Sequence, residues 1–187
     1  MKIGITGSLS SGKSAALKML ARNKYPSFSA DHFVRKLYKK KKFQIKLKKK
    51  FKIQNIKNIK KQIKDLIIQK KIQLVQLEEL IHPIIRKNMK IFLKKNIKKR
   101  LIFLEIPLLI ESKLKDYFDI IIFIEATKKI RLKRYMQKGG NKKIFLKLDK
   151  NQINQKKKKL NCDYLVVNNR SIKALKKRLM HIICDYE

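Results

Sequence analysis

Residues 2–14, KIGITGSLSSGKS, constrain the fold of this 187-residue chain more than any other segment. The stretch GSLSSGKS at 7–14 matches the pattern G-x-x-x-x-G-K followed by Ser or Thr. Apolar residues at strand spacing, including Ile5, precede it, and Leu17 and Leu20 follow it at helical spacing. A strand, this loop and a helix in that order predict a site where backbone N–H groups and the positive helix N-terminus bind phosphate.

The side chains at the end of the loop predict a nucleotide as the ligand. Lys13 is placed to reach the β- and γ-phosphates, and the Ser14 hydroxyl is placed to ligate Mg²⁺. A chance glycine-rich turn is the weaker interpretation, because a strand and a helix flank the loop. The residues expected to bind the nucleotide are Gly7, Ser8, Leu9, Ser10, Ser11, Gly12, Lys13, Ser14 and Ala15.

Strand-like and helix-like segments alternate along most of the chain. The continuous apolar run at 119–126 is typical of a strand buried on both faces. The segment 142–160 is polar and basic, and we expect it to be mobile. This alternation predicts an α/β fold with a doubly wound, five-stranded parallel sheet. The other expected strands are 26–31, 100–106 and 163–168, and the expected helices are 32–40, 130–137 and 171–186, the last capped by Ser171.

Residues 43–97 have a different pattern. No strand-like run occurs there, and apolar residues recur at helical spacing, as at Ile59, Ile63 and Leu66. Pro83 suits the first turn of a further helix, because a proline has no N–H to leave unpaired there. We therefore expect a helical insertion in the α/β core.

Several polar residues follow the predicted strands, where ligands of open parallel sheets bind. Asp31 could accept a proton from an acceptor hydroxyl or could cap the helix after it, and the residues alone leave both roles open. Glu105 could hold Mg²⁺ beside the loop or could be a solvated strand-end charge, and the magnesium role is favoured. Gly7 and Asn168 also fall at strand ends.

Basic residues in two predicted helices are further candidates. His82 and Arg86 are four residues apart and share a face if one helix contains both. A metal role for His82 is not expected, because no second ligand stands at metal spacing. We expect Arg131 to be a solvated helix cation.

The formal net charge of +38 has two interpretations. Neutralisation of phosphates by Lys and Arg would explain it in a nucleic-acid binder. The lysine runs at 39–42, 46–50 and 156–159 are however dispersed, and no aromatic residues interleave with them. The excess of Lys, Ile and Asn also fits an AT-rich genome, so we favour solvated faces and expect no specific nucleic-acid partner. Such runs can still attract anionic substrates.

Cysteine usage and hydropathy indicate a cytoplasmic protein. Cys162 and Cys184 are too few for a disulfide framework or for a metal site of their own. No apolar run reaches membrane-spanning length, and a strand at the first residues leaves no place for a signal peptide. We therefore expect no membrane contact.

Five segments resemble dephospho-CoA kinases in content and order. They are ITGSLSSGKS, FSADHFVRKLY, LEELIHPIIRKNM, FLEIPLLIE and CDYLVVNN. The resemblance spans nearly the whole chain, and the loop combined with L-E-x-x-x-H-P-x-x-R and P-L-L-x-E is specific. It implies a P-loop kinase-type fold. The implied parts are a nucleotide-binding core at 1–42, 98–137 and 161–187, a helical substrate-binding insertion at 43–97 and a short lid at 138–160.

The resemblance also implies a reaction, which is the last step of coenzyme A biosynthesis. The ATP γ-phosphate would pass to the ribose 3′-hydroxyl of 3′-dephospho-CoA, with Mg²⁺, to give CoA and ADP. The protein would be a monomer or a weak homo-oligomer whose partners are these two substrates. Catalytic roles would fall to Lys13, Asp31 and Arg134, of which Arg134 also binds ATP. Acceptor binding would fall to Asp31, His82, Arg86 and Pro107, and Mg²⁺ binding to Ser14 and Glu105.

The chain departs from this family at two places. Ser8 and Ser10 replace glycines of the loop, and a serine is strained wherever φ is positive. In the lid, Leu148 stands near the position of a family arginine, one turn before Gln152. The cations beside it are Lys147 and Lys150, which lack the bidentate fork of arginine.

Two other functions remain open. A small-molecule kinase of the nucleoside-monophosphate-kinase type would share the loop, the insertion and the lid, but LEELIHP and EIPLLIE argue against it. A basic nucleic-acid-binding P-loop protein is favoured only by the net charge. Glu111, at the end of EIPLLIE, matches the family pattern and could equally be a helix-surface charge.

Overall fold

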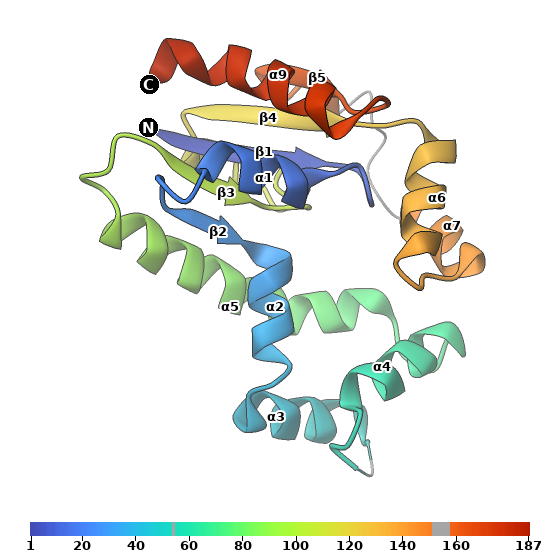
Figure 1. The fold of residues 1–187 in the computed structure, drawn as a ribbon. Coiled ribbons are helices and arrows are strands. Elements are labelled where there is room, and N and C mark those ends of the chain that lie inside the picture. The colour runs from blue at the N-terminus through green and yellow to red at the C-terminus, as the bar shows by residue number, and fades with distance from the viewer. Residues whose placement is uncertain (54, 151–157) are drawn as a thin grey trace. The chain divides into compact units, whose positions relative to one another are not determined.

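Five parallel strands form the centre of the fold. The computed structural model describes residues 1–53, 55–150 and 158–187. The strands pair in the order β2-β3-β1-β4-β5, and all four pairings are parallel, as predicted (Figure 1). The carboxyl ends of the strands therefore lie along one edge of the sheet. The bounds are β1 Lys2–Gly7, β2 Ser27–Ser29, β3 Ile102–Glu105, β4 Ile120–Glu125 and β5 Tyr164–Val167.

Two helices pack on one face of this sheet. Helix α1 (Lys13–Ala21) follows β1, and α9 (Ile172–Ile183) follows β5. The core on this face combines Ile3 and Ile5 of β1 with the apolar sides of both helices. Gly4, between these isoleucines, faces the other way, where an added Cβ would contact Leu109 and Phe118. The helix residues in the core are Leu17, Leu20, Leu175, Leu179 and Ile183, and full burial of each such side chain contributes about 1.5–3 kcal/mol.

The chain forms two compact units, Met1–Ala30 with Lys95–Glu187, and Asp31–Lys94. The second unit is helical and has its own core. This agrees with the helical pattern predicted for 43–97, whereas the substrate-binding role of that segment stays a prediction. Its elements are most of α2 (Ala30–Leu37), α3 (Lys41–Phe51), α4 (Ile59–Ile68) and most of α5 (Leu74–Lys95). Its core includes Leu37, Phe43, Leu47, Ile53, Ile59, Ile63, Leu77 and Ile81.

Pro83 lies inside α5, so the prediction that it begins a helix is wrong. A proline within a helix removes one backbone hydrogen bond and crowds the preceding turn. The helix continues because its apolar side is buried on both sides of the proline, at Ile81 and at Met89. As a consequence, His82 and Arg86 lie in one helix, four residues apart.

The segment predicted to be mobile begins with a helix. After β4 the chain forms α6 (Lys128–Gln137) and then α7 (Lys142–Lys150), and α7 buries Phe145 completely. The polar and basic composition of this segment thus does not exclude a helix with one buried apolar side chain, and the mobility of α7 stays a prediction. The part of that prediction at 151–157 lies outside the described residues.

The ends of two helices also bear on the predictions. The β2–β3 pairing ends with Ser29 opposite Glu105, and α2 starts at the next residue. Asp31 therefore lies in the first turn of α2, so the expectation that it ends a strand is wrong.

The predicted N-cap of α9 is confirmed, since the Ser171 hydroxyl oxygen accepts a hydrogen bond from the Ala174 N–H at 3.2 Å.

Among the described residues, no helix combines the length and the apolar character that crossing a bilayer requires.

Candidate active site

The loop between β1 and α1 requires glycine at two positions. Gly7 has a φ of +145°, and a Cβ there would collide with the Ile124 carbonyl oxygen. Gly12 has a φ of +109°, and a Cβ there would collide with the Asn168 side-chain amide. The loop thus lies directly against β4 and the residue that follows β5, and only glycine fits at these two contacts.

The two serines at glycine positions differ in backbone conformation. Ser10 has a φ of +58°, which is the condition under which strain was expected. Ser8 has no positive φ, so that reason for strain does not apply to it. Its carbonyl oxygen instead accepts a hydrogen bond from the Ser11 N–H at 3.1 Å, which closes a turn within the loop. Of the two serines that replace family glycines, only Ser10 therefore has a backbone conformation that strains a serine.

Lys13 extends along the inside of the loop and is only 6% exposed. Its ammonium donates hydrogen bonds to the carbonyl oxygens of Gly7 and Ser8, at 3.0 and 2.8 Å. These two acceptors carry no formal charge, so they solvate the buried cation without neutralising it. The positive charge of Lys13 thus lies at the loop where the sequence pattern predicts that phosphate binds.

Two side chains outside the loop hold the Ser11 carbonyl oxygen. The Asn168 amide nitrogen donates to it at 2.8 Å, and the Arg134 guanidinium donates at 3.3 Å. Arg134 also donates to the Asn168 amide oxygen at 3.4 Å. In a trans peptide the C=O and the next N–H point to opposite sides, so these bonds aim the Gly12 N–H away from Arg134 and Asn168. The orientation of one loop donor is thereby fixed.

Glu105 connects the loop helix with strand β2. The carboxylate is 1% exposed, and its two oxygens accept hydrogen bonds from the Ser14 and Ser29 hydroxyls, each at 2.6 Å. The two residues predicted to hold Mg²⁺, Ser14 and Glu105, are thus in direct contact. Sequence reasoning missed Ser29, and the one available signal was a polar residue near the end of the predicted strand 26–31.

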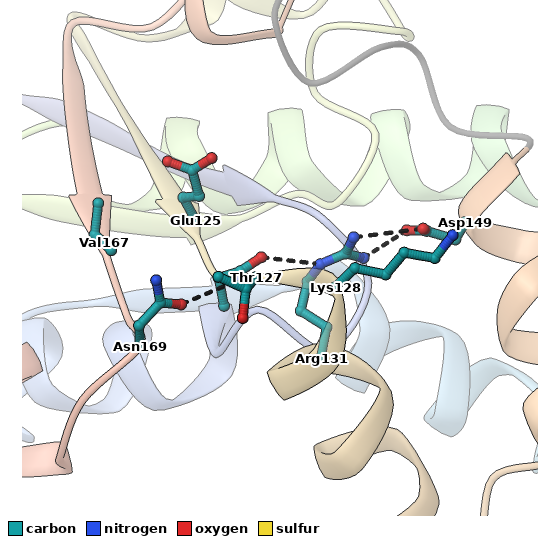
Figure 2. A pocket seen from close by; sticks show the side chains of 8 residues that line it. Glu125, Thr127, Lys128, Arg131, Asp149, Val167 and Asn169 are labelled. Carbon is teal, nitrogen blue, oxygen red and sulfur yellow. Dashed lines mark hydrogen bonds and ion pairs between the residues drawn. The ribbon is translucent and has the colours of Figure 1, made fainter.

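Arg131 is buried, so the expectation of a solvated cation is wrong. It is 2% exposed and forms an ion pair with Asp149 of α7 at 2.5 Å. Figure 2 shows both residues among the side chains that line a pocket of about 520 Å³. The two residues are 18 positions apart in predicted separate segments, so the sequence offered no signal for this pairing.

Glu111 follows β3 in a turn and not on a helix, so its interpretation as a helix-surface charge is wrong. Its carboxylate forms an ion pair at 2.5 Å with the ammonium of Lys158, which is fully buried. This pair ties the turn after β3 to the segment before β5. A buried pair of this kind is costly to break from one side, because the remaining charge has no partner.

The remaining candidates of the first unit lie near a strand end or in the segment predicted to be a lid. The Pro107 carbonyl oxygen accepts a hydrogen bond from the Thr6 hydroxyl at 3.2 Å, which connects the ends of β3 and β1. In α7, Lys147 and Lys150 are exposed, and Leu148 is half-buried. Gln152, the reference point for the missing family arginine, lies outside the described residues.

Three acceptor-side candidates belong to the second unit. His82 and Arg86 share one side of α5, being one helical turn apart. Asp31 lies in the first turn of α2, which starts at Ala30, so Asp31 is not the N-cap of that helix. An acidic residue in a first turn interacts favourably with the helix dipole.

The fold and the loop together define a class of protein. A parallel sheet of this order carries the phosphate-binding pattern after β1, the buried Lys13 inside the loop and the Ser14–Glu105 contact at the strand ends. These are the parts with which P-loop kinases bind a nucleoside triphosphate and its metal. The structure is therefore that of a P-loop kinase.

Comparison with known proteins identifies the family. The model of the dephospho-CoA kinase family matches residues 1–174, and the chain belongs to that family. It is 32% identical over 188 residues to the dephospho-CoA kinase of Rickettsia prowazekii, covering 100% of this chain and 98% of that protein.

Solved structures agree in fold. A Thermus thermophilus protein superposes with a TM-score of 0.77 at 24% identity, covering 99% of this chain and 97% of that one. The dephospho-CoA kinase from Campylobacter jejuni superposes with a TM-score of 0.70, also at 24% identity and with the same coverage of both chains. At such identities the two structures support the P-loop kinase fold alone.

Proposed function

We propose that this protein transfers the γ-phosphate of ATP to the ribose 3′-hydroxyl of 3′-dephospho-CoA, giving CoA and ADP. Membership of the dephospho-CoA kinase family supports the choice of acceptor. The observation that carries the phosphoryl-transfer chemistry is the Ser14–Glu105 contact at the start of the loop helix. The contact joins the hydroxyl of Ser14, which directly follows Lys13, to the buried carboxylate of Glu105.

The donor side consists of residues in the first unit. The loop from Gly7 to Ala15 binds the ATP phosphates through its backbone N–H groups, and Lys13 adds a positive charge. Arg134, which contacts the loop at Ser11, adds a second positive charge. Phosphoryl transfer depends mainly on positioning and on stabilising charge at the transferring group, so Lys13 and Arg134 are assigned catalytic roles.

The oxygen donors beside the loop fit Mg²⁺. Mg²⁺ takes hard oxygen ligands and keeps several waters, so one or two protein groups together with substrate phosphates suffice. Ser14 and Glu105 provide a hydroxyl and a carboxylate oxygen within 2.6 Å of each other. No group of three or more His, Cys, Asp or Glu residues suited to a metal occurs among the described residues. When bound, Mg²⁺ would neutralise developing charge on the phosphates.

The acceptor side is assigned to four residues. Asp31 acts as general base, or orients the 3′-hydroxyl, and it follows Ser29 by two residues along the chain. His82 and Arg86 of α5 bind dephospho-CoA, with Arg86 pairing with its phosphates. Pro107, two residues after the end of β3, is the fourth residue assigned to acceptor binding.

The state of the two cysteines bears on the cellular compartment. Cys162 and Cys184 are both free thiols, which fits a reducing compartment such as the cytoplasm. We assign the protein as a monomer or weak homo-oligomer, with ATP and dephospho-CoA as its partners.

A panel of acceptors tests the proposed function. ATP consumption is measured with Mg²⁺ and, in turn, dephospho-CoA, nucleoside monophosphates, DNA and RNA at physiological salt. Dephospho-CoA should raise turnover and yield CoA, detected by mass, whereas the other additions should not. Turnover with a nucleoside monophosphate alone would assign the protein to the other kinase class. Stimulation by nucleic acid alone would give the net charge of +38 a functional meaning.

A further inference from the structure

Arg131 joins three separate segments of the first unit. Its Nε donates to the Ala126 carbonyl oxygen at 3.1 Å, just after β4. One terminal nitrogen donates to the Leu9 carbonyl oxygen in the phosphate loop at 3.4 Å and to the Asp149 Oδ1 at 2.5 Å. The other donates to the Asp149 Oδ2 at 3.4 Å (Figure 2). The end of β4, the loop and α7 thus meet at one side chain.

The surroundings hold the guanidinium in one orientation. It is paired in a bidentate manner with Asp149, a geometry that fixes the plane of the group as well as its position. The Phe145 ring, itself fully buried, lies with its centre 5.6 Å from the Arg131 Cζ, within the range of a cation–π contact. Both ring and carboxylate come from α7, so this helix determines where Arg131 points.

The contact with Leu9 has a consequence for the next residue. The Leu9–Ser10 peptide is trans, so holding the Leu9 carbonyl towards Arg131 turns the Ser10 N–H to the opposite side. Ser10 has a φ of +58°, a conformation that a serine adopts only with strain. The hydrogen bond from Arg131 to the Leu9 carbonyl oxygen opposes a flip of the Leu9–Ser10 peptide that would relieve this strain. Arg131 therefore acts on the loop next to Ser10, a non-glycine residue with a positive φ.

We infer that Arg131 is a positioning residue for the nucleotide, which orients the Ser10 N–H through the Leu9 carbonyl, and that Asp149 holds Arg131 in place. Arg131 does not touch the phosphates in this scheme. It makes the packing of α7 a condition for a correctly formed loop. The inference rests on the proposed function only in that the loop binds a nucleotide.

The decisive variant replaces the ion pair by apolar residues, Arg131→Met with Asp149→Leu. Exchanging a buried ion pair for apolar residues of similar size is often neutral for stability, so the melting temperature should stay near that of the wild type. Loss of the oriented donor should still raise the dissociation constant for ADP–Mg²⁺ roughly 10-fold or more, as expected for one hydrogen bond to a charged group. Titration calorimetry measures this constant without any acceptor.

A single substitution keeps the inference testable if the double variant fails to fold. Asp149→Asn preserves shape but leaves Arg131 without its charged partner, so it should lower the melting temperature and also weaken ADP–Mg²⁺ binding well below the melting range. Lys129→Met, at an exposed site of the same helix, makes the same change in charge as Arg131→Met and should alter neither quantity. In steady state, the KM for ATP should rise more than that for dephospho-CoA.

Each outcome decides between positioning and a purely structural role. A folded variant that binds ADP–Mg²⁺ as tightly as the wild type would overturn the inference, whatever its melting temperature. If the wild-type protein binds ADP–Mg²⁺ but does not phosphorylate dephospho-CoA, the proposed function fails and the inference is still tested by the binding constants.

Discussion

The Ser14 hydroxyl donates a hydrogen bond to Glu105 at 2.6 Å, across 91 positions of sequence. The other oxygen of the same carboxylate accepts from Ser29 at the same distance. Glu105 is thus held from two sides at the end of β3, and it presents its charge at the first turn of α1. The proposed Mg²⁺ site depends on this carboxylate.

Glu105→Gln tests that assignment. The amide has nearly the same shape and its oxygen can still accept the Ser14 hydrogen bond, so the fold should be preserved. Loss of the negative charge should raise the Mg²⁺ concentration for half-maximal activity roughly 10–100-fold, the range for substitutions around metal sites. Titration of activity with Mg²⁺ at saturating substrates measures it. Asp116→Asn, at an exposed site in the same unit, should leave the titration unchanged, and an unchanged curve for Glu105→Gln would remove Glu105 from the metal site.

Gly12→Ala tests the close approach of Asn168 to the loop. The substitution combines a φ of +109° with a collision against the Asn168 amide, so it should displace the Ser11 carbonyl contact and weaken nucleotide binding. We expect at least a roughly 10-fold higher dissociation constant for ADP–Mg²⁺, equivalent to about 1.4 kcal/mol. Gly139→Ala is the matched control, because Gly139 has a φ of +76° but nothing within 4 Å of an added Cβ. Equal effects of both substitutions on binding would mean that the contact with Asn168 is unimportant.

Asp31→Asn tests the general base. Asn cannot accept the proton of the 3′-hydroxyl as a carboxylate does, so kcat should fall roughly 10²–10⁴-fold at saturating ATP and dephospho-CoA. Asp31 lies in the first turn of α2 and is not its cap, so the variant should lose only a few tenths of a kcal/mol to about 1 kcal/mol of helix-dipole interaction. Thermal melting is the control. A stable variant that keeps most of its turnover would leave Asp31 with a role in helix α2 only.

Arg86→Ala tests the acceptor side. Arg86 lies in α5 of the second unit, whereas the loop that binds ATP belongs to the first. The KM for dephospho-CoA should therefore rise roughly 10-fold or more, as expected for loss of a charge-assisted contact, with a smaller change in the KM for ATP. Lys87→Ala, the exposed neighbour on the same helix, is the control for a lost positive charge. The reverse pattern of KM values would place Arg86 at the nucleotide.

Sequence alone identified the parts whose signal is local. The strand, loop and helix around Lys13 follow from spacing within a short stretch, and the strands β3, β4 and β5 follow from apolar runs bounded by polar residues. Glu105 was found because a strand end is a place that can be recognised from the pattern of a single segment. Order, spacing and period are properties of neighbouring residues, which is why these predictions needed no coordinates.

The tertiary structure decided which distant residues meet. Arg131 looked like a surface cation because nothing in its own helix shows that α7 covers it with Phe145 and Asp149. Pro83 was predicted to begin a helix because proline by itself prefers the first turn. The helix continues through Pro83 because α5 is buried both before and after it, at Ile81 and Met89. Burial and pairing depend on elements far apart in the chain, and their free energies exceed the local propensities on which sequence reasoning rests.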